Sequence, residues 1–125
     1  MLHIVLVAAG GAIGASLRHL VASASLRLVG RNFPWGTLTV NLLGCLAMGV
    51  IIGLLARRSH ASNELRLFVA TGLLGGFTTF SAFSLDFAVL WERGAPLAAF
   101  LYAAASVLGS LAALFLGLWL VRVTS

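Results

Sequence analysis

Four long apolar runs, joined by short connections, constrain this chain more than any other feature of its sequence. They cover residues 2–28, 35–56, 65–90 and 96–121. A helix needs about 20 apolar residues to cross the hydrocarbon core of a bilayer, and each run is long enough. A chain of 125 residues that is 61% hydrophobic could not hide so much apolar surface in a water-soluble fold, because small folds leave a large share of their surface exposed. We therefore predict an all-α integral membrane protein, with residues 1–125 forming a single membrane domain of four transmembrane helices.

The first run lies where a secretory signal would lie. A signal peptide carries a basic segment ahead of its apolar core, whereas here the start of the run holds only His3 and no Lys or Arg. We therefore expect an uncleaved first helix.

The third run holds residues that a simple membrane anchor does not need. It contains Gly72, Gly75 and Gly76, and Thr78 and Thr79 follow two and three residues after the last glycine. In hydrocarbon, an interrupted helix is tolerated only where the freed backbone is buried in protein or lines a cavity. We predict that this helix is broken near residues 72–79 and that the break marks a functional site in the middle of the membrane.

The basic residues give the chain a net charge of +5, and all eight are arginines. Nucleic-acid binding would need a basic cluster with interleaved aromatic residues, and the only adjacent pair is Arg57-Arg58. We expect no nucleic-acid partner. In a membrane protein, arginines instead indicate the orientation of the helices.

The arginines are divided almost evenly between the two sides of the membrane. The side with both termini and the 57–64 connection holds Arg57, Arg58, Arg66 and Arg122. The other side holds Arg27, Arg31 and Arg93, plus Arg18 if its half of the first helix is counted. Because orientation is set by a bias in this count, we predict that the chain inserts both ways and that inverted copies pair as an antiparallel two-fold homodimer. The alternatives are that one charge suffices to orient the chain or that the helix boundaries used for the count are misplaced.

Polar and aromatic side chains recur at helical spacing on the other runs. Helix neighbours share a face at three or four residues' separation, and three such sets are present: Thr37 with Asn41; Tyr102 with Ser106 and Ser110; Phe80 with Phe83, beside Ser81 and Ser84. Hydroxyls in membrane helices often bond only to backbone or to a neighbouring helix. An amide such as Asn41 is costly at this depth without partners. The two charges nearest mid-span, Arg18 and Asp86, are functional candidates by position, unless they reach an interface by snorkelling.

These groups suit ions better than a reaction. Hydroxyls, an amide and a phenol can donate hydrogen bonds to an anion, and aromatic ring edges carry partial positive charge. Unwound carbonyls suit a hard cation such as Na⁺. The sequence holds no nucleophile–base pair or paired-carboxylate site, so we do not expect an enzyme.

Two motifs together resemble a known family. They are GTLTVNL over residues 36–42 and TGLLGGFTTFSAFS over residues 71–84, and they are similar to those of the Fluc (CrcB) fluoride channels of microorganisms. The Arg18 region and the Tyr102–Ser110 stripe are similar as well, so that the resemblance spans all four helices. Ala82, Asp86 and Leu114 depart from commoner versions, which puts the outer ends of the polar stripe in question but leaves its centre intact.

The resemblance implies a dual-topology antiparallel homodimer, multi-pass in the bacterial inner membrane and surrounded by lipid, with two passive fluoride pores that export F⁻ from the cytoplasm and reduce its toxicity. It implies these roles: Phe80 and Phe83 line the pore; Asn41 bonds the anion; Tyr102, Ser106 and Ser110 form a polar track; Thr37 lies near a vestibule. It also implies a structural Na⁺ at the dimer centre, held by main-chain carbonyls of Gly75 and Thr78 from both subunits.

Two other functions stay open at this point. A small dual-topology multidrug or cation exporter has similar dimensions, but such exporters resemble one another in a membrane-embedded Glu on the first helix, and residues 2–28 contain no carboxylate. A non-transporting scaffold subunit would use its interior polar groups for packing alone.

Overall fold

The computed structural model describes residues 1–58 and 62–124, which form four helices long and apolar enough to cross a membrane. They are α1 (Leu2–Leu28), α2 (Trp35–Arg57), an interrupted helix over Asn63–Glu92, and α6 (Pro96–Val123). The interrupted helix consists of α3 (Asn63–Arg66), a π-helix η1 (Leu67–Leu74), α4 (Gly75–Phe77) and α5 (Ser81–Glu92). The predicted all-α fold and the broken third helix are confirmed, and each predicted end lies within two residues of the observed one.

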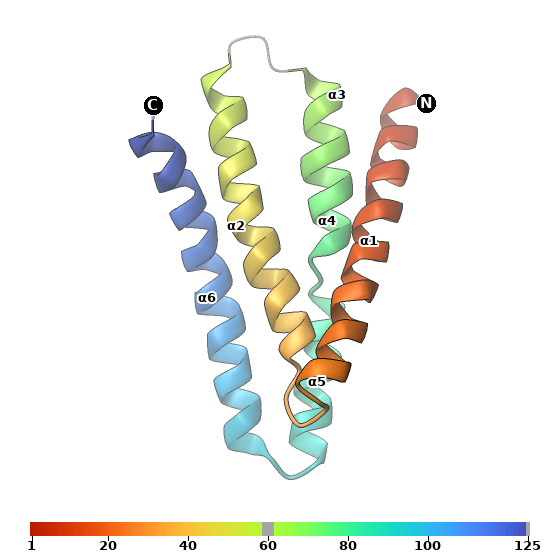
Figure 1. Ribbon diagram of the computed structural model, residues 1–125, viewed down its shortest axis with the longest axis vertical. Coiled ribbons are helices and arrows are strands. Elements are labelled where there is room, and N and C mark those ends of the chain that lie inside the picture. Colours follow the sequence, from red (N-terminus) through yellow and green to blue (C-terminus); the bar gives the residue numbers. More distant parts are fainter. Residues whose placement is uncertain (59–61, 125) are drawn as a thin grey trace.

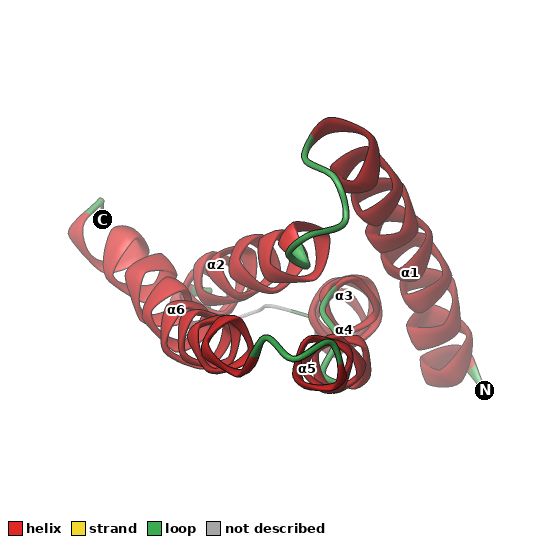
Figure 2. Ribbon diagram, turned by 90° about the horizontal axis from the view of Figure 1, so that it is seen from below, coloured by secondary structure: helices red, strands yellow, loops and turns green. Residues whose placement is uncertain are grey.

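The helices cross back and forth, so that both termini lie at one end of the molecule with the α2–α3 connection (Figure 1). We call this end side A, and the end with the α1–α2 and α5–α6 connections side B. α6 lies along α2, while α1 lies on the opposite side of the interrupted helix (Figure 2). α2 and α3 diverge toward side A. This arrangement places the arginines on the two sides as the sequence predicts.

Glycines join α1 to the first half of the interrupted helix. A Cβ atom on Gly72 would lie 2.9 Å from the Val7 carbonyl oxygen, and one on Gly76 would lie 2.7 Å from the Gly11 carbonyl oxygen. From the other side, a Cβ on Gly14 would lie 2.8 Å from the Phe77 amide nitrogen. Small residues allow this close approach of two membrane helices.

The predicted extent of the break, residues 72–79, is therefore too wide. Gly72 lies within η1, and Gly75 and Gly76 begin α4. Only Thr78, Thr79 and Phe80 separate α4 from α5. Gly72 and Gly76 allow close packing against α1, whereas Gly75 makes no such approach. The π-helix η1 ends before the break.

α2 and α6 also pack through glycines. A Cβ on Gly49 would meet the Gly117 Cα atom at 3.1 Å, and one on Gly53 would meet the Val121 Cβ atom at 3.1 Å. In return, a Cβ on Gly117 would lie 2.8 Å from the Val50 amide nitrogen. The two backbones are thus in direct contact, which fixes the face that α6 turns toward the interior.

Most large apolar side chains face outward. Leu108 is 67% exposed and Phe115 is 64% exposed, both on α6. The buried core lies toward side B and contains Leu38, Leu90, Ala99 and Tyr102. An apolar exterior over four membrane-length helices identifies a multi-pass membrane protein.

The α1 contact can be tested with two neighbouring glycines. Gly10→Ala places its Cβ 2.8 Å from the Leu73 amide nitrogen, whereas Gly11→Ala meets nothing nearer than the Gly72 carbonyl oxygen at 3.9 Å. We expect Gly10→Ala to destabilise the protein by ~1–3 kcal/mol, the usual cost of overpacking, and Gly11→Ala to have little effect. Thermal unfolding in detergent, followed by size-exclusion chromatography, measures the difference. Equal melting temperatures for the two variants would contradict the packing described.

Candidate functional site

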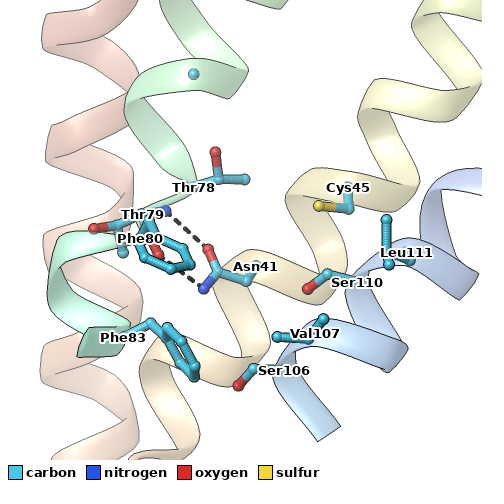
Figure 3. A pocket seen from close by; sticks show the side chains of 11 residues that line it. Asn41, Cys45, Thr78, Thr79, Phe80, Phe83, Ser106, Val107, Ser110 and Leu111 are labelled. Atoms are coloured by element: carbon cyan, nitrogen blue, oxygen red, sulfur yellow. Dashed lines mark hydrogen bonds between the residues drawn. The ribbon is translucent and has the colours of Figure 1, made fainter. Parts of the chain in front are cut away.

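Asn41 on α2 holds the break in the third helix. Its side-chain oxygen accepts a hydrogen bond from the Thr79 amide at 2.8 Å, and its amide group donates to the Thr79 carbonyl at 3.0 Å (Figure 3). Asn41 is only 8% exposed. The Asn41 side chain thus satisfies both the amide and the carbonyl of Thr79, which have no helical partners at the break. An unwound segment is tolerated within a membrane when its backbone groups are satisfied in this way.

The break takes the helical donors away from several carbonyl groups, including those of Gly75 and Thr78. In a continuous α-helix, the Thr79 amide would bond to the Gly75 carbonyl, and the Ala82 amide to the Thr78 carbonyl. Here the Thr79 amide donates to Asn41, and the Ala82 amide donates to the Thr79 hydroxyl at 3.1 Å. The carbonyls of Gly75 and Thr78 are therefore left without their helical donors. These are the two oxygens expected to hold a cation.

Arg18 stabilises the end of the first half-helix. Its Nε atom donates to the Gly76 carbonyl at 3.2 Å. A cation is favourable at the C-terminus of a helix, where unpaired carbonyls carry partial negative charge. The structure thus gives Arg18 a definite interior contact, and its guanidinium lies beside the break.

A cavity of about 460 Å³ opens beside this break, between α2, α5 and α6. Its lining residues are Asn41, Cys45, Gly75, Thr78, Thr79, Phe80, Phe83, Ser106, Val107, Ser110 and Leu111. Ser106 and Ser110 extend from α6 toward the space that Asn41 and Phe83 also face (Figure 3). The structure therefore brings together predicted residues from three helices, none of them charged.

Ser106 is the most informative of these residues. It is 5% exposed, and its hydroxyl makes no hydrogen bond of full geometry within the described residues, although the phenol of Tyr102 lies close to it. A buried polar group without a partner costs free energy and in native proteins usually marks a bound water, ion or ligand. The hydroxyl is therefore available to a species occupying the cavity.

Aromatic rings continue from the cavity toward side B. The Phe80 and Phe83 ring centroids are 5.4 Å apart, and those of Phe83 and Tyr102 are 5.2 Å apart. Tyr102 is fully buried, and its hydroxyl donates to an Asp86 carboxylate oxygen at 3.2 Å. Thr37 and Ser106 lie close to the same phenol. Tyr102 thus joins the cavity to the buried side-B cluster without lining the cavity itself.

Other predicted residues lie outside the cavity. The Ser84 hydroxyl donates to the Phe80 carbonyl at 3.0 Å, and the Ser81 hydroxyl lies 3.3 Å from that of Thr79. Asp86 lines a separate cavity of about 390 Å³ at side B, together with Arg31 and Arg93. Arg93 also donates to the Asn32 carbonyl at 2.8 Å, which ties the two side-B connections together.

Sequence reasoning missed four residues that line the cavity, namely Cys45, Thr79, Val107 and Leu111. Thr79 is the hub of the break, because its amide, carbonyl and hydroxyl all make hydrogen bonds. Cys45 lines the cavity one turn after Asn41. The spacing of four residues between Asn41 and Cys45 could have indicated Cys45, whereas nothing in the sequence pairs Thr79 with a residue 38 positions away.

Comparison with known proteins assigns the family. The profile of the family described as "CrcB-like protein, Camphor Resistance (CrcB)" matches residues 5–118. This chain belongs to the CrcB family. The matched range includes both halves of the broken helix and every residue that lines the central cavity.

Several similar CrcB-family proteins carry a functional name. A protein of Mesorhizobium japonicum named "Fluoride-specific ion channel FluC" is 65% identical over 122 residues, which is 98% of each chain. One of Chelativorans sp. with the same name is 62% identical over 98% of each chain. Another, of Sphingopyxis alaskensis, is 54% identical over 93% of this chain and 92% of its own.

The role of Asn41 at the break predicts a stability difference within one cavity. Asn41→Leu would leave the Thr79 amide and carbonyl without partners, and we expect a loss of ~1–3 kcal/mol. Ser110→Ala removes a hydroxyl that lines the same cavity but makes no hydrogen bond with the described residues, and we expect little change. Melting temperatures in detergent measure both, and an unaffected Asn41→Leu protein would show that the break does not depend on this contact.

Proposed function

We propose that this protein is the subunit of a passive, fluoride-selective ion channel. Its CrcB-family relatives are named fluoride-specific ion channels, and its own cavity has the chemistry for a small anion. The observation that carries the proposal is the buried hydroxyl of Ser106, which lines an uncharged cavity together with aromatic rings and an amide.

The cavity suits an anion that must pass rather than stay. Ser106 and Ser110 can each donate a hydrogen bond, and the edges of Phe80 and Phe83 present partial positive charge. No charged side chain is among the lining residues. Conduction requires binding weak enough to permit exit, so neutral donors are better suited than an arginine at this depth.

The pathway needs a second copy of the chain to be complete. Phe80 stands at the break, in the middle of the interrupted helix, yet it is 75% exposed. Four short helices enclose little space, and the central cavity is open at its surface. The near-even arginine count supports insertion in both orientations. An antiparallel homodimer with two-fold symmetry would cover Phe80 and close two equivalent pores.

The carbonyls of Gly75 and Thr78 fit a structural Na⁺ at the centre of such a dimer. Both have lost their helical donors to side-chain contacts, and unwound carbonyl groups suit a hard cation. Two carbonyls from each subunit would hold the ion and join the subunits. The ion would supply positive charge close to the pores and fix the geometry of both breaks.

Passive conduction is sufficient for the physiological task. HF is a neutral weak acid that crosses membranes and dissociates in the more alkaline cytoplasm. The resulting F⁻ would leave through a pore in the inner membrane, driven by the negative interior potential. Export in this way lowers fluoride toxicity without ATP or proton coupling.

The two rival functions predict different properties. A proton-coupled exporter of this kind uses a carboxylate in its substrate path, whereas the lining of the central cavity has neither Asp nor Glu among the described residues. A scaffold subunit would pass no ions, and substitution of Phe80 would leave it unchanged.

Fluoride efflux from liposomes tests the proposal. Purified protein is reconstituted with internal KF, and a fluoride electrode follows release after valinomycin sets a K⁺ potential. We expect F⁻ to leave without ATP or a pH gradient, and Cl⁻ to be retained. Folded dimer that gives no efflux above empty liposomes would contradict the channel.

A matched pair of substitutions on α5 and its N-cap locates the pathway. Phe80→Ile removes a cavity-lining ring edge, and we expect flux to fall roughly tenfold or more, as a barrier increase of ~1.4 kcal/mol would produce. Phe87→Ile makes the same change at a ring that packs on Trp91 and Phe100 instead, and we expect near-normal flux. Equal rates in the two variants would remove Phe80 from the pathway.

A further inference from the structure

Two cavities at side A flank the end of α2. They share Leu55, Arg58 and Ser62 as a common wall. The larger, about 420 Å³, is otherwise apolar and is lined by Ile51, Leu54, Leu65 and Val69. The smaller, about 290 Å³, adds Ile52, Ala56, Asn63 and Arg66. Their lining residues come from the end of α2, from Arg58 and Ser62, and from the start of the interrupted helix. The ribbons of α2 and α3 diverge at this end of the molecule (Figure 1).

The polar part of this region is positively charged. Arg58 and Arg66 both line the smaller cavity, and within the described residues neither guanidinium has a hydrogen bond or ion pair. Among the residues that the structure describes, no acidic side chain lines either cavity. The nearby carboxylate of Glu64 lies beside α1 instead, 3.9 Å from the ring nitrogen of His3.

The position of the two cavities is that of the membrane–water boundary. α2 ends at Arg57 and the next transmembrane helix begins at Asn63. Arg58 and Arg66 therefore lie at the depth of lipid headgroups, while Ile51 and Val69 lie deeper, at the depth of acyl chains. Basic pockets between transmembrane helices are a recurrent binding site for anionic headgroups, and arginine can bind a phosphate through two parallel hydrogen bonds.

We propose that this region binds one anionic phospholipid. The phosphate lies between Arg58 and Arg66, and an acyl chain follows the apolar cavity formed by Ile51, Leu54, Leu65 and Val69. A free phosphate or fluoride would use only the two arginines, whereas the shared wall joins a basic pocket to an apolar one of comparable size. A phospholipid is the occupant that would fill the basic cavity with its phosphate and the apolar cavity with an acyl chain. This inference does not depend on ion conduction.

Native mass spectrometry of the purified protein released from mild detergent tests the proposal. We expect dioleoyl-phosphatidylglycerol to bind in preference to dioleoyl-phosphatidylcholine. Arg58→Gln with Arg66→Gln should weaken binding of the anionic lipid roughly tenfold or more, since both arginine contacts are lost. Arg57→Gln removes an adjacent charge that lines neither cavity and should leave binding near the wild-type level.

Further arms of the experiment use the wild-type chain and need no variant to fold. Dihexanoyl-phosphatidylglycerol, with the same headgroup but short chains, should bind much more weakly than the dioleoyl form. Inorganic phosphate at equal concentration should not displace the dioleoyl lipid. Equal binding of the two headgroups, equal binding of the two chain lengths, displacement by phosphate, or a double variant that binds as wild type would each overturn the proposal.

Discussion

The two hydrogen bonds between Asn41 and Thr79 are the contact on which the rest of the structure depends. They exchange backbone partners for side-chain partners at one residue, and so allow a transmembrane helix to end and restart inside the membrane. Three features of the site follow from this break. The carbonyls of Gly75 and Thr78 lose their helical donors, Arg18 binds the exposed carbonyl of Gly76, and Phe80 is left projecting from the break. An isolated anchor helix would gain nothing from such an arrangement, because each unpaired group is costly in hydrocarbon.

The two halves of the interrupted helix are anchored to different neighbours. The first half meets α1 through interlocking glycines such as Gly14 and Gly76. The second half packs against α6 and the buried Tyr102, which in turn bonds Asp86. α2 contributes Asn41 at the junction and lies against α6 for most of its length. Packing therefore holds each half of the interrupted helix in place on either side of the break. The cavity lies beside the break, between α2, α5 and α6.

The number and limits of the helices follow from the sequence, because a bilayer fixes the length of an apolar run. The break was expected for a partly wrong reason. In the sequence, Gly72 and Gly76 suggest a broken helix. In the structure they allow α1 to approach closely, and this role depends on which helix lies opposite. Asn41 was recognised as costly, yet its partner Thr79 is 38 residues away and no local pattern identifies it. Ser106 was predicted from its spacing with Tyr102 and Ser110, and it does line the cavity. Single residues could thus be selected from helical periodicity, but their contacts required the packing of three helices.

The central claim is that the cavity beside the break is part of the ion pathway, and the chain carries its own probe for it. Cys45 is the single cysteine of the sequence and lines this cavity. The protein is labelled in detergent with methyl methanethiosulfonate, labelling is quantified by mass spectrometry, and fluoride efflux is measured after reconstitution. We expect complete labelling to abolish efflux, while a Cys45→Ala protein treated in the same way conducts normally. Full efflux from protein that is completely labelled at Cys45 would contradict the account.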